Sequence, residues 1–172
     1  MKGIKTMVKK VMKIVGIVFI VLLIVGIGIL VYLCYQNLHW WEKDMKQIEE
    51  LGVVERQVTL PNENVINYGE LGGDGPALLL IHGQMASWED YSSVMPQLYE
   101  NWHIYAIDIY GHGESTHEEE VYYLDINGDD IIWFIENVIQ QETVVSGHSN
   151  GALTAAYIAA YGGDCKLCAA LQ

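Results

Sequence analysis

Residues 143–161 read TVVSGHSNGALTAAYIAAY, and this stretch decides the predicted fold. Residues 143–147 form a short apolar run, typical of a strand that is buried on both faces. Residues 150–161 are rich in alanine, the strongest helix former. Between the two stands Gly147-His148-Ser149-Asn150-Gly151, a G-x-S-x-G motif in the context of strand, sharp turn and helix.

The chemistry of this motif rests on Ser149. A serine hydroxyl is a poor nucleophile until a base takes its proton. A strained turn lifts such a hydroxyl above the sheet and presents it to that base. Gly147 and Gly151 are expected to prevent clashes with the flanking strand and helix. A bare G-x-S-x-G occurs by chance in many loops, so the apolar strand and the helix around it give the motif its weight.

Upstream of the motif the pattern also alternates between strands and helices. Strand-like runs separated by turn signals and helical segments imply a mostly parallel sheet with helices on both faces. The first two runs are separated by a Pro-Asn turn signal and predict a hairpin. The predicted strands are 54–60, 65–71, 77–81 and 102–108, the predicted helical segments are 87–100 (in part, with Ser87 as N-cap) and 124–140, and 166–172 resembles the start of a further strand.

The N-terminal region differs from the rest of the chain. Residues 14–33 run for 20 residues without a charge, and as a helix they span about 30 Å, the thickness of a hydrocarbon core. A cleavable signal peptide is the rival interpretation, but its apolar region is shorter and ends in small residues. The sequence favours a retained anchor, with the lysines before it in the cytoplasm and the remainder outside the cell membrane. Trp40 and Trp41 suit the far interface.

Charge separates the two parts of the chain. Five of the nine basic residues precede Leu33 and no acidic residue does, so the remainder carries four basic residues against 22 acidic ones, a formal charge of −18. Nucleic-acid binding needs a basic surface, so this composition argues against a nucleic-acid partner. The sequence predicts four regions along the chain. They are a basic cytoplasmic tail (1–13), a transmembrane signal-anchor (14–35), a juxtamembrane connector (36–52) and a partial α/β domain (53–172). The connector can lie on the membrane or pack on the domain.

Three motifs, in this order, resemble those of the α/β-hydrolase superfamily. Residues 80–84 (LIHGQ) look like the family's strand followed by a His-Gly turn. Residues 108–115 (DIYGHGES) are similar to its D-x-x-G-x-G-x-S loop, and residues 147–151 match its nucleophile elbow. The resemblance covers about residues 54–172.

The resemblance implies roles for individual residues. Ser149 is the implied nucleophile, and the backbone N–H groups of Gln84 and Asn150 are the implied oxyanion hole. The substrate class implied is a small ester or amide, without a metal or an organic cofactor. Support of the elbow and loops is implied for Gly147, Gly151, His82, Gly83 and Asp108.

Other polar and aromatic residues near these motifs leave alternatives open. His82 and His112 more often brace loops than take part in catalysis, and His148 more often lines a pocket than acts as a base. Met85, Trp88 and Tyr110 suit either an acyl pocket or ordinary packing. Cys165-x-x-Cys168 has no second ligand pair, which argues against zinc.

The sequence departs from the family pattern after Ser149. In this fold the triad runs Ser, then Asp or Glu, then His, yet no histidine follows Ser149 and the one acid is Asp164, too early for the triad position. We therefore expect a C-terminally incomplete sheet and little activity from this polypeptide alone. The alternative from another class is a non-catalytic, membrane-tethered binding or scaffold module.

Overall fold

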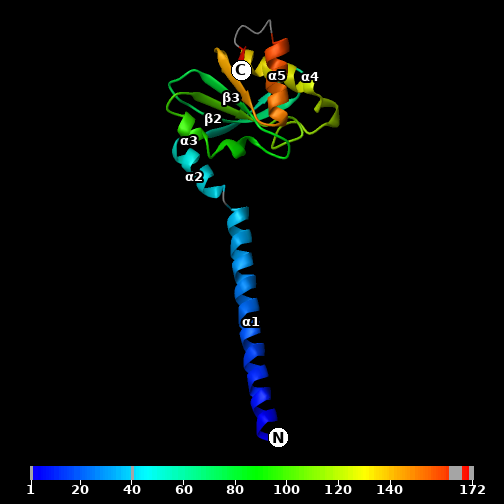
Figure 1. Cartoon of the computed structure of the whole chain (residues 1–172). Helices are drawn as coiled ribbons and strands as arrows, with labels where there is room; N and C mark the ends of the chain where they lie inside the picture. Colours follow the sequence, from blue (N-terminus) through cyan, green and yellow to red (C-terminus); the bar gives the residue numbers. More distant parts are fainter. Residues whose placement is uncertain (1, 40, 163–167, 171–172) are drawn as a thin grey trace. The chain divides into compact units, whose positions relative to one another are not determined.

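The computed structural model describes residues 2–39, 41–162 and 168–170, and the chain divides into two compact units, Met1–Trp40 and Trp41–Gln172. The first unit contains α1 (Lys2–Leu38), a continuous helix of 37 residues (Figure 1). Residues 14–33 are exposed on every face of α1. Among the described residues α1 is the one helix long and apolar enough to cross a membrane. Predictions for Trp40, Asp164 and Cys165 fall outside the described residues.

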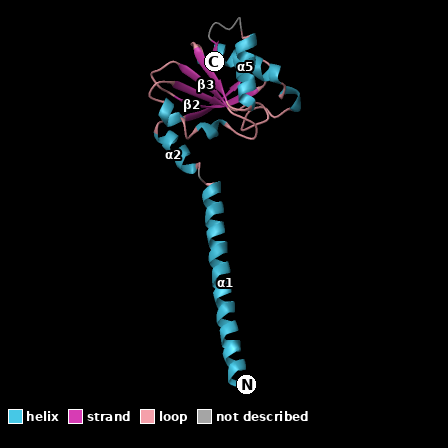
Figure 2. Cartoon of the chain, viewed as in Figure 1, coloured by secondary structure: helices cyan, strands magenta, loops and turns pink. Residues whose placement is uncertain are grey.

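The second unit is built on a sheet, drawn in magenta in Figure 2. Its described strands run in the order β1-β2-β4-β3-β5-β6. The strands are β1 (Val54–Thr59), β2 (Val65–Leu71), β3 (Ala77–Ile81), β4 (His103–Ile107), β5 (Thr143–Gly147) and β6 (Cys168–Ala170). Strands β4, β3, β5 and β6 are parallel, and the β1–β2 hairpin joins them antiparallel through β2 and β4. The predicted α/β architecture with a mostly parallel sheet is confirmed.

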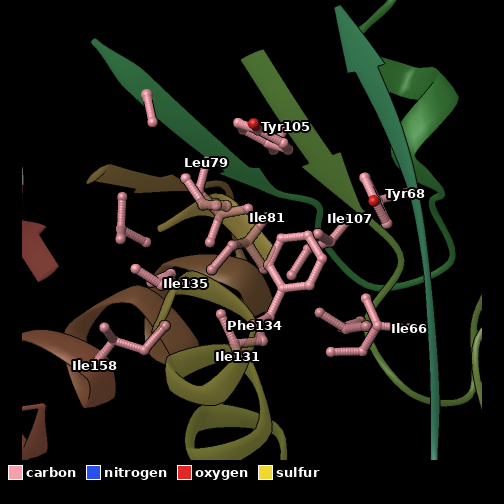
Figure 3. Packing of buried hydrophobic residues seen from close by; sticks show 14 of the residues in the cluster. Ile66, Tyr68, Leu79, Ile81, Tyr105, Ile107, Ile131, Phe134, Ile135 and Ile158 are labelled. Atoms are coloured by element: carbon pink, nitrogen blue, oxygen red, sulfur yellow. The ribbon is translucent and has the colours of Figure 1, made fainter. Parts of the chain in front are cut away.

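Two helices cover one face of this sheet. They are α4 (Leu124–Phe134), continued by the π-helical turn η3 (Ile135–Ile139), and α5 (Asn150–Tyr161). Alternate strand residues point to this face, because successive side chains of a strand lie on opposite sides. Figure 3 shows Phe134 of α4 beside Ile107 and Tyr68, and the rings of Tyr68 and Phe134 meet edge-on with centroids 4.9 Å apart. This apolar layer fixes α4 and α5 beneath the loops that follow the strands.

The opposite face is covered by α2 (Glu42–Glu50), the 3₁₀ turn η1 (Trp88–Tyr91) and the short helix α3 (Met95–Leu98). Ile48 of α2 is fully buried in a cluster with Leu71, Leu78 and Met95. Residues 42–50 of the predicted connector therefore pack on the domain in this structure.

The segment 87–100 forms two short helices instead of one longer one. Ser87 stands at the N-cap position of η1 as predicted, but its hydroxyl contacts the Glu89 carboxylate at 3.4 Å instead of capping a backbone N–H. The Trp88 N–H donates to the buried Asp108 carboxylate at 2.7 Å. A long-range acceptor has thus taken the place of the local cap.

Candidate active site

The G-x-S-x-G motif forms a strained turn between β5 and α5. Ser149 has φ 55° and ψ −115°, a positive φ that side chains other than glycine rarely adopt, and its side chain is exposed. A Cβ on Gly147 would lie 2.2 Å from the Gly151 carbonyl oxygen, and one on Gly151 would lie 2.1 Å from the Ile81 carbonyl oxygen. Both glycines are therefore required by close backbone contact, as the sequence predicted.

The parallel register brings the loop after β3 to the same edge of the sheet. Ile81 of β3 is paired with Gly147 of β5, and the His148 N–H donates to the Ile81 carbonyl at 3.0 Å. A Cβ added to Gly83 would lie 3.1 Å from the Ser149 Cβ. The structure thus places the His-Gly turn directly against Ser149, two segments that are more than 60 residues apart in the chain.

Two backbone N–H groups remain without a partner beside this turn. Among the hydrogen bonds of the described residues, none uses the N–H of Gln84 or of Asn150 as donor. The neighbouring groups are engaged, since Met85 N–H donates to His112 and Gly151 N–H donates to the His148 carbonyl. Two unpaired donors near a candidate nucleophile can bind an oxygen that acquires negative charge.

The ring of His82 is committed to the loops around it. Its Nε2 lies 3.1 Å from the Ile109 N–H, which can only donate, so Nε2 is the acceptor and Nδ1 donates to the Gly83 carbonyl at 2.7 Å. Burial lowers the pKa of His82 and outweighs the opposing effects of that carbonyl and of Asp108. His82 is therefore a neutral brace, and its approach to Asp108 at 3.8 Å is not an ion pair.

His112 has a similar arrangement at the edge of the site. Its Nε2 accepts the Met85 N–H at 3.1 Å, and its Nδ1 faces the Tyr110 carbonyl at 3.2 Å. A ring that accepts at one nitrogen and donates at the other is neutral. His112 therefore joins the His-Gly turn to the loop after β4.

Asp108 organises the loop after β4. It is 2% exposed, and its carboxylate accepts hydrogen bonds from Trp88 N–H, Asn67 Nδ2 and Glu114 N–H at 2.7, 2.8 and 3.2 Å. Gly113 has φ 50°, and a Cβ there would lie 1.9 Å from the Asp108 carboxylate. The D-x-x-G-x-G-x-S motif is thus a loop wrapped around a buried acid, and Asp108 makes structural contacts in this chain.

A cavity of about 410 Å³ opens beside the turn. Gln84 and Asn150 line this cavity, and so do Met85 and Tyr110, which the sequence named as candidates for an acyl pocket. Ser149 is not among the lining residues. Trp88 does not line it, because its ring is buried against Gly69 on the other face of the sheet. The remaining lining residues were not predicted to line a pocket: Ile109, Gly111, His112, Tyr122, Leu124, Asn127 and Thr154.

The unpredicted lining residues reach the cavity through tertiary contacts. Asn127 lies inside α4, where its Oδ1 accepts the Tyr110 N–H at 3.0 Å and its Nδ2 donates to the Val121 and Tyr123 carbonyls. Thr154 lies on the first turns of α5 and is 3% exposed. The sequence shows an asparagine inside a predicted helix at position 127, but its burial became evident only in the structure.

Comparison with known proteins agrees with this arrangement. Residues 76–169 match the family described as alpha/beta hydrolase fold. A Haemophilus influenzae protein named as an esterase or lipase is 31% identical over 85 residues, which cover 49% of this chain and 29% of that protein. The crystal structure of E-2-(acetamidomethylene)succinate hydrolase has a TM-score of 0.58 and 28% identity, and covers 64% of this chain and 41% of the other. The structure of an epoxide hydrolase from an endophytic Streptomyces has a TM-score of 0.60 and 29% identity. The match covers 66% of this chain and 34% of the epoxide hydrolase.

These matches and the folded motifs define the class of protein. The chain belongs to the α/β-hydrolase family, and the relatives named above are hydrolases. It spans less than half the length of each of them.

Proposed function

We propose that this chain carries the nucleophile and the oxyanion hole of a serine hydrolase that cleaves esters, or less favourably amides. Ser149 Oγ attacks the substrate carbonyl carbon, and the N–H groups of Gln84 and Asn150 bind the resulting oxyanion. Loss of the alcohol leaves an acyl group on Ser149. Water then attacks this acyl-enzyme and releases the acid, which regenerates the serine.

One observation carries this proposal: the strained backbone of Ser149, held against the Gly83 turn with two unpaired N–H donors nearby. Strain of this kind costs about 1–3 kcal/mol and persists only where surrounding structure imposes it. A purely structural turn at this junction has no need of a serine with positive φ. The geometry of the elbow therefore supports a reactive hydroxyl at position 149.

The chemistry of serine favours an ester over an epoxide, although several of the similar proteins are epoxide hydrolases. A serine oxygen that opened an epoxide would form an alkyl ether, which water does not readily cleave. An acyl-serine has a carbonyl carbon that water can attack, so the enzyme is regenerated. Ser149 thus supports the reaction class in the name of the Haemophilus influenzae relative.

The base is the missing component among the described residues. The rings of His82 and His112 are bonded to loop backbone, and those of His103 and His117 bond Glu70 and Gly113. Within the part of the chain that the structure describes, His148 is the histidine whose ring makes no hydrogen bond. It adjoins Ser149, and its Nδ1 would lie 3.2 Å from a Cβ on Gly83. We expect slow chemistry from the 172-residue chain unless a base is supplied.

The test is covalent labelling of the whole chain with a fluorophosphonate, with and without added imidazole as a base. Ser149→Ala is the nucleophile variant, and Ser146→Ala, three residues earlier on β5, is the matched control. We expect slow labelling that imidazole accelerates, that Ser146→Ala retains and that Ser149→Ala abolishes. Absence of labelling at every imidazole concentration would contradict the proposal and favour the non-catalytic, membrane-tethered binding or scaffold module.

We also propose that α1 is a retained single-pass anchor with its N-terminus in the cytoplasm and the hydrolase domain outside. The length and composition of α1 support a membrane span, and the lysines that precede residue 14 support this orientation. Peptide mapping of the mature protein distinguishes an anchor from a cleaved leader. A mature N-terminus near residue 35 would contradict the anchor.

A further inference from the structure

Among the described residues, no charged side chain lines the cavity beside Ser149. None of its lining residues is Asp, Glu, Lys or Arg, and the ring of its one lining histidine, His112, is neutral because Nε2 accepts the Met85 N–H. Ligand pockets usually fix their substrates through a few polar groups placed in an apolar wall. The lining of this cavity therefore shows which polar groups a substrate can meet.

Most polar side chains of the wall already have partners within the protein. Asn127 uses its carbonyl oxygen and its amide for three backbone groups. The Tyr110 hydroxyl donates to Asp130 at 2.7 Å, and the Tyr122 hydroxyl donates to the His117 carbonyl. The wall thus offers few donors to a ligand beyond the groups of Gln84, Asn150 and Thr154, all of which are neutral.

The basic residues that the structure describes outside α1 lie elsewhere in the domain. Lys43 and Lys46 belong to α2, where Lys46 faces Glu50 at 3.9 Å. Arg56 on β1 donates to the Glu70 carboxylate at 2.7 Å. None of these three cations lines the cavity.

Acidic and apolar residues stand near its rim. The exposed run Glu118-Glu119-Glu120 immediately precedes the segment that supplies Tyr122 and Leu124 to the lining. Together with the formal charge of −18 after Leu33, it gives the domain a negative potential that opposes the approach of anions. Met85, Tyr122 and Leu124 are 93%, 45% and 44% exposed, so the rim presents apolar surface to a ligand.

We infer that this cavity selects substrates whose bound group is uncharged and excludes those that place a carboxylate in it. The inference rests on the proposed function, because it names the substrate class of the same site. An ionised carboxylate loses its hydration on entering such a cavity, and no described lining residue is a cation that could replace it. The free N–H donors of Gln84 and Asn150 bind the ester carbonyl in the proposed mechanism, so they are not available to a second, anionic group of the substrate. A neutral acyl or alkoxy group meets the apolar wall without that cost.

The test compares two esters that differ only in charge, methyl succinamate and monomethyl succinate. Their binding to the isotope-labelled full chain in detergent micelles is measured by NMR, from the amide signals of Asn150, Thr154 and Leu124. We expect the neutral amide to bind about tenfold or more tightly than the anion at low salt, since the anion is desolvated without a partner. Added salt should narrow the difference, because it screens the negative domain.

A charge added at the rim provides the matched test. Leu124→Lys should raise the affinity for monomethyl succinate and remove most of the preference. Leu153→Lys, at a position on α5 that is 59% exposed and outside the lining, should leave the preference unchanged. Equal or tighter binding of monomethyl succinate by the unmodified chain, or absence of binding by both esters, would overturn the inference.

The binding readout is independent of Ser149 chemistry, so it is repeated with Ser149→Ala. In one outcome, the variant keeps the preference for the neutral ester while fluorophosphonate fails to label the unmodified chain. That pair of results would reject the serine mechanism and retain the uncharged pocket. Normal labelling of Ser149 together with tight binding of monomethyl succinate would reject the uncharged pocket and retain the serine mechanism.

Discussion

Replacement of Gly151 by alanine sets two effects of opposite sign against each other. Gly151 is the second residue of α5, where alanine is favoured over glycine by at most the helix-interior value of about 1 kcal/mol. However, the added Cβ would lie 2.1 Å from the Ile81 carbonyl oxygen and 2.5 Å from that of His82. Both are backbone atoms at the end of a central strand, so they cannot turn aside as a side chain would.

The steric effect should dominate. Overpacking of a tight site costs about 1–3 kcal/mol, and a contact with fixed backbone belongs at the upper end of that range. After the helix-propensity gain, we expect a net loss of about 2 kcal/mol in the free energy of unfolding. For a domain of this size the loss corresponds to a fall in Tm of about 6–10 °C.

The assay is thermal and urea unfolding of the full chain in detergent, followed by tryptophan fluorescence. Ala156→Gly, an exposed site in the same helix, is the control for helix propensity alone and should cost about 1 kcal/mol. Stability of Gly151→Ala equal to or above that of the unmodified chain would refute the steric explanation of the motif's second glycine.

Three further predictions follow from the same contacts. Asp108→Asn removes the charge that accepts the N–H of Trp88 and the amide of Asn67, so the free energy of unfolding should fall by about 2–3 kcal/mol in urea titrations; the exposed Glu120→Gln should show no such fall. Burial disfavours the charged form of His82, so its pKa in the folded state lies below the ordinary value of 6.5. The stability that the neutral buried ring contributes is therefore fully present above pH 6.5 and is lost as the pH falls below it. His82→Gln should therefore flatten the acid side of a plot of unfolding free energy against pH, and an unchanged slope would contradict the neutral-ring assignment. Protease added to intact cells should digest the hydrolase domain and spare the N-terminal tail, whereas a protected domain would reverse the proposed orientation.

The sequence alone determined the features that depend on neighbouring residues. The apolar runs of β3 and β5, the small-residue helix α5 and the glycine at 147 are local signals, and each element formed within a residue or two of its predicted bounds. The strain of the elbow is also local, since it arises where a strand turns directly into a helix. For that reason Ser149 could be predicted as the candidate nucleophile before any contact was known.

Tertiary structure decided everything that depends on segments far apart in the chain. Pairing of β3 with β5 brings Gly83 against Ser149, and no sequence periodicity records this contact. The tautomers of His82 and His112 are set by backbone N–H groups 27 residues away, which turned two possible bases into structural braces. Asn127 reaches the cavity only because α4 packs beneath the loop after β4. Sequence patterns specify which groups are present, whereas their partners are fixed by long-range packing, and at this site the partners determine the chemistry.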